Sequence, residues 1–111
     1  MTKNILTLSS ISPLAAEALG NGYKVAEKAD MPEGILVRAF EMKDYEIDKT
    51  VKIVARAGAG VNNIPLDKYA AKGIVVCNTP GANSNGVKEL TILALLLCGR
   101  DVFNGIQWTQ G

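Results

Sequence analysis

Short apolar runs rich in β-branched residues alternate with turn-forming segments along this chain. Runs of this kind, bounded by glycine, proline, asparagine or serine, are typical of β-strands. The pattern predicts five strands, at residues 5–8, 23–26, 35–37, 51–55 and 74–77. Three of these runs are almost continuously apolar, which favours strands of a parallel sheet that is covered on both faces.

Helix signals lie between two pairs of these runs. Ser12-Pro13 offers an N-cap and a proline for the first helical turn, followed by the apolar residues 14–19. A second helix is predicted at residues 66–72, where Gly73 provides the stop directly before the last strand. The order strand, helix, strand predicts parallel pairing of the strands.

The connection between the third and fourth predicted strands is less regular. Residues 38–50 show only a weak helical pattern, which is centred on residues 43–47. A short helix and an irregular crossover therefore remain alternatives for this segment.

The last predicted element is a helix at residues 86–100, which is apolar on nearly every face from Leu90 to Cys98. A helix that is apolar all round must be buried on more than one side. We therefore expect another domain or a second subunit to cover it. Residues 103–111 carry Ile106 and Trp108 without any further element to pack against.

The composition adds one strong restriction, because the 111 residues include no histidine. The chain cannot by itself form a Ser-His-Asp triad, a Cys-His pair or a histidine metal site. The 12 basic and 11 acidic residues leave a net charge of +1, so neither nucleic acid nor a membrane surface is an expected partner. The longest apolar stretch is also far shorter than the roughly 20 residues of a membrane-spanning helix.

Both cysteines, Cys77 and Cys98, lie inside apolar runs. We predict that they are reduced and behave as small buried hydrophobic residues. No CxxC motif or ligand-like cluster accompanies them, so we expect no metal site and a cytoplasmic location.

The turn Gly58-Ala59-Gly60, after the fourth predicted strand, is open to three explanations. A dinucleotide-binding turn fails, because the third glycine of its motif is replaced by Asn63 and the region around Asn78 lacks the expected acidic residue. A tight turn at a strand end is the plain alternative. The third is a nest of backbone N–H groups that holds a ligand carboxylate, which the location at a strand's carboxyl end favours.

Other polar residues are expected at the same edge of the sheet. Arg38 follows the third strand and is either a solvated charge or a fork for a carboxylate or phosphate. Arg56 serves in the same way or anchors neighbouring loops. In the segment 78–86, Asn83 and its neighbours either cap the last helix or hydrogen-bond a ligand.

Taken together, these segments resemble the NAD-dependent D-2-hydroxyacid dehydrogenases. The resemblance covers essentially the whole chain and rests on an ordered set of motifs: LVRA at 36–39, RAGAGVNNI at 56–64, GIVVCNTPGANS at 73–84 and EL at 89–90. It implies a flavodoxin-like or Rossmann-like α/β fold, with a parallel sheet of about five strands flanked by helices. It further implies a substrate-binding domain at 1–85, a bridging and interface helix at 86–102 and, at 103–111, the start of a linker to a separate NAD-binding domain.

The resemblance also implies roles for individual residues. Contacts with the phosphate or hydroxyacid end of the substrate would come from Arg38, Ala39 and Asn83. The backbone N–H groups of Ala57, Gly58, Ala59 and Gly60 would hold its carboxylate, while Ala59 and Val87 would border the nicotinamide. Ala39 stands where relatives often carry serine, which removes one hydroxyl contact.

These roles describe one part of an enzyme. The implied substrate is a small phosphorylated hydroxyacid, and NAD is expected to bind mainly to the separate domain. No catalytic residue is expected in this chain, and a homo-oligomer is expected to form through Leu90 to Cys98. The alternative is a stand-alone, non-catalytic flavodoxin-like module that binds a small anion or has a regulatory role.

Overall fold

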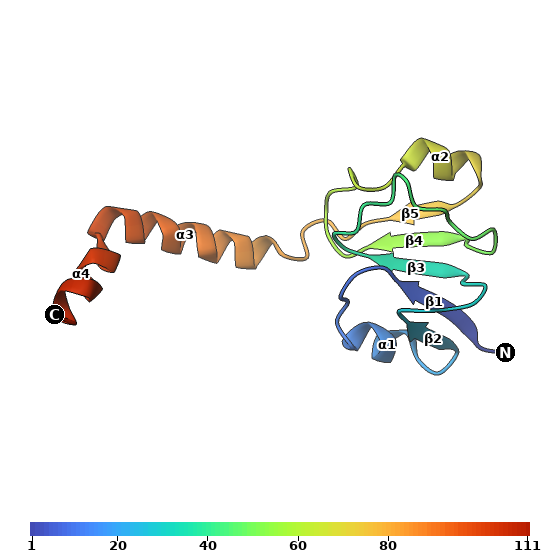
Figure 1. The fold of residues 1–111 in the computed structure, drawn as a ribbon, viewed down its shortest axis with the longest axis horizontal. Helices are drawn as coiled ribbons and strands as arrows, with labels where there is room; N and C mark the ends of the chain where they lie inside the picture. The colour runs from blue at the N-terminus through green and yellow to red at the C-terminus, as the bar shows by residue number, and fades with distance from the viewer. The chain divides into compact units, whose positions relative to one another are not determined.

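The computed structural model describes residues 1–111, which divide into two compact units, Met1–Pro80 and Gly81–Gly111. The first unit contains a sheet and two short helices, shown in Figure 1: β1 (Lys3–Thr7), α1 (Leu14–Leu19), β2 (Tyr23–Ala26), β3 (Gly34–Val37), β4 (Ile53–Arg56), α2 (Leu66–Ala71) and β5 (Val75–Cys77). The second unit contains α3 (Ser84–Arg100) and α4 (Val102–Thr109).

All five strands pair in parallel, in the order β2-β1-β3-β4-β5. This is the strand order of the flavodoxin-like fold, so the predicted α/β class is confirmed. Each predicted strand is present, with bounds that differ by at most two residues. β4 begins two residues later than predicted, at Ile53, because a turn between Asp48 and Val51 precedes it.

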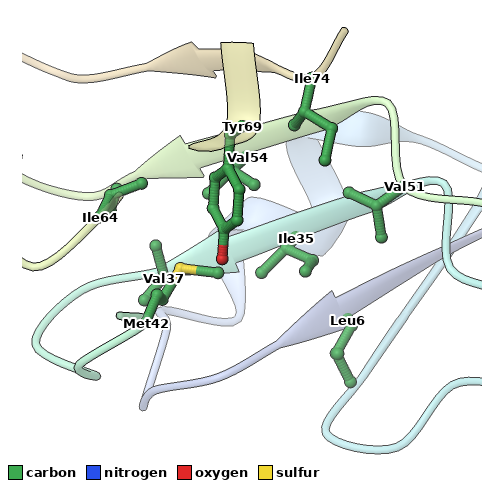
Figure 2. Close-up of a cluster of buried hydrophobic side chains, with 9 residues drawn as sticks. All are labelled: Leu6, Ile35, Val37, Met42, Val51, Val54, Ile64, Tyr69 and Ile74. Atoms are coloured by element: carbon green, nitrogen blue, oxygen red, sulfur yellow. The ribbon is translucent and has the colours of Figure 1, made fainter. Parts of the chain in front are cut away.

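The core lies on one face of the sheet, where side chains from β1, β3 and β4 meet α2 and three connecting segments (Figure 2). Tyr69 of α2 is fully buried there. The cluster consists of Leu6, Ile35, Val37, Met42, Val51, Val54, Ile64, Tyr69 and Ile74. The connection at 38–50 is an irregular crossover rather than a helix, and it contributes Met42 to this core.

The opposite face of the sheet is only partly covered. In β4 and β5 the side chains alternate, so Val54 points into the core while Ile53 and Val75 are 41% and 57% exposed. The prediction that both faces are covered holds for the central strand β3 but is wrong for β4 and β5. Cys77 at the end of β5 is exposed for the same reason, so its predicted burial is also wrong.

The second unit confirms the predicted long helix and adds another. Between α3 and α4, Asp101 adopts a left-handed conformation, with φ of 47°. The interpretation of 103–111 as linker missed α4, whose start is supported by a hydrogen bond from Asn104 Nδ2 to Asp101 Oδ1 (2.8 Å). No residue of either helix is buried, and Cys98 is exposed, contrary to prediction. None of the helices has the length and hydrophobicity needed to cross a bilayer.

Candidate functional site

The loops that follow β3 and β4 start side by side at the carboxyl edge of the sheet. Val37 and Arg56, the last residues of the two strands, are paired in register. The N–H of Ala57 donates a hydrogen bond to the carbonyl oxygen of Val37 (2.8 Å), which extends the pairing by one step. The structure thus brings together the two loops that carry Arg38 and the glycine turn.

The backbone around Arg38 is held by hydrogen bonds from three directions. The Oγ of Ser9 accepts hydrogen bonds from the N–H groups of Arg38 (3.1 Å) and Phe40 (3.3 Å). The Nδ2 of Asn63 donates to the carbonyl oxygen of Phe40 (2.8 Å), and the Nε of Arg56 donates to that of Arg38 (3.0 Å). Because its backbone is fixed and Arg38 itself is exposed, its guanidinium is available to an anion.

Ser9 and Asn63 are site residues that the sequence analysis missed. Asn63 was considered only as the residue that breaks a glycine motif, yet it is 9% exposed and its amide ties two loops together. The available signal was topological: Ser9 follows β1, and β1 lies next to β3, so Ser9 must lie near the loop after β3. No comparable signal marked Asn63, because its burial follows from the loops that the sheet brings together.

The glycine turn depends on Gly58, which has φ of +153°. A Cβ atom at this position would lie 2.6 Å from Nη1 of Arg56, so the guanidinium fills the space that the glycine opens. A dinucleotide-binding turn uses that space for a pyrophosphate and leads directly into a helix. Here α2 starts only at Leu66, so the turn does not fit a dinucleotide.

Two of the four N–H groups predicted to form the nest are already engaged. The N–H of Ala57 donates to the carbonyl oxygen of Val37 (2.8 Å), and the N–H of Gly58 donates to Oγ1 of Thr79 (2.8 Å). The N–H groups of Ala59 and Gly60 have no hydrogen-bond partner in the structure, and both residues are exposed. This corrects the predicted nest, which is reduced to these two donors.

The loop after β5 supports the glycine turn. The N–H of Thr79 donates to the carbonyl oxygen of Gly58 (3.0 Å), and Nδ2 of Asn78 donates to that of Ala59 (2.8 Å). From the sequence, the segment 78–86 was open to two interpretations, capping of the last helix or a hydrogen bond to a ligand, and Asn83 was its only predicted site residue, so Asn78 and Thr79 were missed.

The groups with shifted pKa lie away from this edge. A hydrogen bond from Lys52 lowers the pKa of Glu33, which precedes β3 at the opposite edge of the sheet. The N–H and hydroxyl of Thr50 lower the pKa of Asp48, and burial raises the pKa of Tyr69 in the core. No cluster of His, Cys, Asp and Glu is arranged to hold a metal ion. The carboxyl edge therefore offers cationic side chains and N–H donors, which suit the binding of an anion.

Asn83 and Val87 belong to the second unit. Asn83 precedes the first residue of α3 and makes no side-chain capping bond, while Val87 is exposed in the first turn. Their roles at the substrate and at the nicotinamide remain predictions. Ala39 is exposed within the loop held by Ser9 and Asn63.

A family model, curated proteins and solved structures match this chain. The family described as "D-isomer specific 2-hydroxyacid dehydrogenase, catalytic domain" matches residues 7–106. D-3-phosphoglycerate dehydrogenase of Sus scrofa is 31% identical over 115 aligned residues, covering 90% of this chain and 22% of that protein. The chain spans about a fifth of the length of the curated relatives it matches.

Solved structures give the same result. NAD⁺-bound 3-phosphoglycerate dehydrogenase of Entamoeba histolytica has a TM-score of 0.64 at 28% identity, covering 87% of this chain and 39% of that one. The NADPH-dependent glyoxylate/hydroxypyruvate reductase of Sinorhizobium meliloti, in complex with NADP and malonate, has a TM-score of 0.74 at 27% identity, covering 99% and 38%. The five-stranded parallel sheet flanked by helices is thus shared with dehydrogenases and reductases of known structure.

Proposed function

The chain belongs to the D-isomer specific 2-hydroxyacid dehydrogenase family, and we propose that it is the substrate-domain part of an enzyme similar to phosphoglycerate dehydrogenase. The whole enzyme would oxidise 3-phosphoglycerate to 3-phosphohydroxypyruvate, with NAD as the acceptor, as in serine biosynthesis. The observation that supports this proposal is that the exposed Arg38 and the unbonded N–H groups of Ala59 and Gly60 belong to neighbouring loops at one edge of the sheet.

The proposed substrate is anionic at both ends. Its carboxylate is matched by the N–H groups of Ala59 and Gly60, which have no partner within the chain. Its phosphate is matched by Arg38, whose guanidinium can donate two parallel hydrogen bonds to an anion. The loops that carry these groups are hydrogen-bonded to each other through Arg56, which holds their backbones at a fixed spacing.

We assign NAD binding mainly to a further part of the enzyme, since the glycine turn of this chain does not fit a dinucleotide. When bound, NAD supplies the acceptor for the hydride. Within this chain, Ala59 and Val87 would border the nicotinamide. The hydroxyl proton needs a general base, which we also assign to another part of the enzyme because this chain contains no histidine.

We further propose a homo-oligomer formed through α3, from Leu90 to Cys98. This segment leaves Leu90 67% exposed and Leu95 69% exposed, which is unusual for leucines of a folded chain without a partner. Sedimentation tests this point, and a monomer at high concentration would contradict it. The two free cysteines, Cys77 and Cys98, fit the reducing environment of the cytoplasm.

A second candidate is a glyoxylate or hydroxypyruvate reductase, which acts on a 2-oxo acid without a phosphate. The observation that favours it is the similarity to the Sinorhizobium meliloti reductase, which covers 99% of this chain. The two candidates differ in whether an arginine must pair with a phosphate.

Calorimetric titration of the chain with D-3-phosphoglycerate and, separately, with D-glycerate distinguishes the candidates. We expect D-3-phosphoglycerate to bind at least about tenfold more tightly, since one charge-assisted pair contributes roughly 1.5–3 kcal/mol. Arg38→Ala should remove this preference, whereas Arg100→Ala, which changes an exposed arginine of α3, should leave it unchanged. Equal binding of both ligands would favour the reductase, and an unchanged preference in Arg38→Ala would exclude Arg38 as the phosphate ligand.

A further inference from the structure

Two successive carbonyl groups of the glycine turn are held by a single neighbouring loop. The carbonyl oxygen of Gly58 accepts a hydrogen bond from the N–H of Thr79 (3.0 Å). The next carbonyl oxygen, that of Ala59, accepts one from Nδ2 of Asn78 (2.8 Å). Both donors belong to adjacent residues just after β5, so both carbonyl groups point toward the same loop.

The planarity of the peptide bond then fixes the direction of the free N–H groups. In a trans peptide the C=O and the following N–H lie in one plane and point in opposite directions. The N–H of Ala59 shares its plane with the carbonyl of Gly58, and the N–H of Gly60 shares its plane with the carbonyl of Ala59. Both N–H groups must therefore point away from Asn78 and Thr79, which leaves them open to a ligand.

The hydroxyl of Thr79 adds a third restraint on the same turn. Its Oγ1 accepts the N–H of Gly58 (2.8 Å) and lies 3.4 Å from the carbonyl oxygen of Arg56, to which it can donate. The peptide units before and after Gly58 are thus both fixed by one residue. Gly58 needs this support, because glycine has more accessible backbone conformations than any other residue and loses the most conformational entropy when its φ is fixed, here at +153°.

We propose that Asn78 and Thr79 are positioning residues, which orient the N–H groups of Ala59 and Gly60 toward the carboxylate of the ligand. The proposal rests on the proposed function, because that function identifies the ligand as a hydroxyacid. Donors that are oriented before binding lose little entropy when the ligand arrives, so the two residues act on affinity without touching the ligand.

The alternative is that these hydrogen bonds only join the ends of β4 and β5. In that case their loss would lower the stability of the fold without changing the direction of the N–H groups. Thr79→Val removes the hydroxyl bonds to Gly58 and Arg56 while it keeps the backbone N–H bond to Gly58 and nearly the shape of threonine, so the direction of the N–H groups, measured beside stability, separates the two roles. Thr79→Ser keeps the hydroxyl, and Asn78→Ala removes the other donor from an exposed position.

Thr50→Val provides a matched control. Thr50 also holds a loop through its hydroxyl, which donates to the carbonyl oxygen of Pro32 (2.7 Å), but it lies before β4 rather than after β5. The loss of unfolding free energy in Thr50→Val shows how much a hydroxyl with a purely structural role contributes, and it can be compared with the loss in Thr79→Val.

The test measures N–H residual dipolar couplings and ¹⁵N relaxation of Ala59 and Gly60 in the 111-residue chain, together with the dissociation constant for D-3-phosphoglycerate. We expect Asn78→Ala to increase the motion mainly of the Gly60 N–H vector, and Thr79→Val, which frees the N–H of Gly58, to increase mainly that of the adjacent Ala59 N–H vector. Each variant should raise the dissociation constant about tenfold, the effect of roughly 1.4 kcal/mol. Thr79→Ser and Thr50→Val should match the unchanged chain in both measurements.

Unchanged N–H vectors in both Thr79→Val and Asn78→Ala would overturn the inference, whatever the ligand does. Mobile vectors with an unchanged dissociation constant would equally overturn it, because the orientation would then not serve binding. If the unchanged chain shows no binding of D-3-phosphoglycerate, the proposed function fails instead, and the N–H vectors still decide whether Asn78 and Thr79 orient the turn.

Discussion

The Nε of Arg56 donates a hydrogen bond to the carbonyl oxygen of Arg38 over 3.0 Å and so joins the loops after β3 and β4. The sequence left open whether Arg56 binds a ligand or anchors a loop. Its Nε anchors the loop, while Nη1 lies against Gly58. The side chain of Arg56 thus holds the backbone of Arg38 in place, and both loops of the candidate site depend on Arg56.

Gly58→Ala should disturb this arrangement. A Cβ would lie 2.6 Å from Nη1 of Arg56, and φ of +153° is strained for any L-residue. We expect the free energy of unfolding to fall by about 1–3 kcal/mol, as for other strained backbone positions, as measured by urea denaturation. Gly60→Ala is the control, since its Cβ would meet nothing closer than 3.5 Å. Equal losses in the two variants would show that the conformation of Gly58 has no special role.

Asn63→Ala should destabilise the chain and loosen the loop after β3. The buried amide holds the carbonyl oxygens of Phe40 (2.8 Å) and Arg38 (3.3 Å), which alanine would leave without this donor. The expected loss is about 1–3 kcal/mol, with faster amide hydrogen exchange near Phe40. The neighbouring exposed Asn62 provides the comparison, and Asn62→Ala should stay within about 0.5 kcal/mol. Similar values for both would argue against a role of Asn63 as a tie between the loops.

Much of the fold was predictable because the strands are short apolar runs bounded by turn residues. The strand order also explains why Arg38 and the glycine turn meet, since neighbouring parallel strands end at one edge. The roles of Ser9 and Asn63 were not predictable from local pattern, because they depend on which loops the sheet brings together.

Burial was predicted less well than secondary structure. Cys77 lies in an apolar run, but the run belongs to an edge strand with one face partly open, so the thiol is exposed. An apolar run shows that a residue can be buried, whereas the neighbouring elements decide whether it is. The helix α4 was missed because the family resemblance implied the start of a linker at 103–111.

Tyr69→Phe should leave the free energy of unfolding unchanged or raise it by about 1 kcal/mol, because a buried hydroxyl without a partner is costly. The hydroxyl of Tyr69 is buried and makes no hydrogen bond, and it lies near Val37 and Met42 in Figure 2. Tyr69→Ala, in contrast, should cost about 3–5 kcal/mol through the cavity it leaves. A clear loss in Tyr69→Phe would mean that the hydroxyl has a partner in solution.

The same residue predicts a response to alkaline pH. Burial raises the pKa of Tyr69 above its ordinary value of 10.0, so the folded chain favours the neutral phenol. The contribution of the neutral phenol to the free energy of unfolding is fully present below pH 10. It is lost as the pH rises through the pKa that Tyr69 has in the folded chain. Denaturation across this range should show a smaller decline in Tyr69→Phe than in the unchanged chain.

Asp48 predicts a response to acid. The N–H of Thr50 donates to its Oδ1 (2.9 Å), and the hydroxyl of Thr50 shares its one proton between this oxygen (2.8 Å) and the carbonyl oxygen of Pro32 (2.7 Å). Both bonds from Thr50 hold the pKa of Asp48 below the ordinary value of 3.8. A lowered pKa contributes stability above pH 3.8 that is lost as the pH falls through the pKa of the folded chain. Carboxyl ¹³C titration should give Asp48 a pKa below that of aspartate in an unstructured peptide. Asp48→Asn should remove the loss of stability that protonation of Asp48 causes in acid. A normal titration of Asp48 would contradict the two hydrogen bonds.

The central claim is that the carboxyl edge of the sheet binds the two ends of a hydroxyacid through Arg38 and the N–H groups of Ala59 and Gly60. The most direct measurement is a ¹H–¹⁵N titration of the chain with D-3-phosphoglycerate, which reports each amide separately. The account predicts saturable shifts at Ala59 and Gly60 and at the Arg38 side chain, with little change at Ala57 and Gly58, whose N–H groups are already engaged. Shifts confined to other parts of the chain, or none at all, would contradict it.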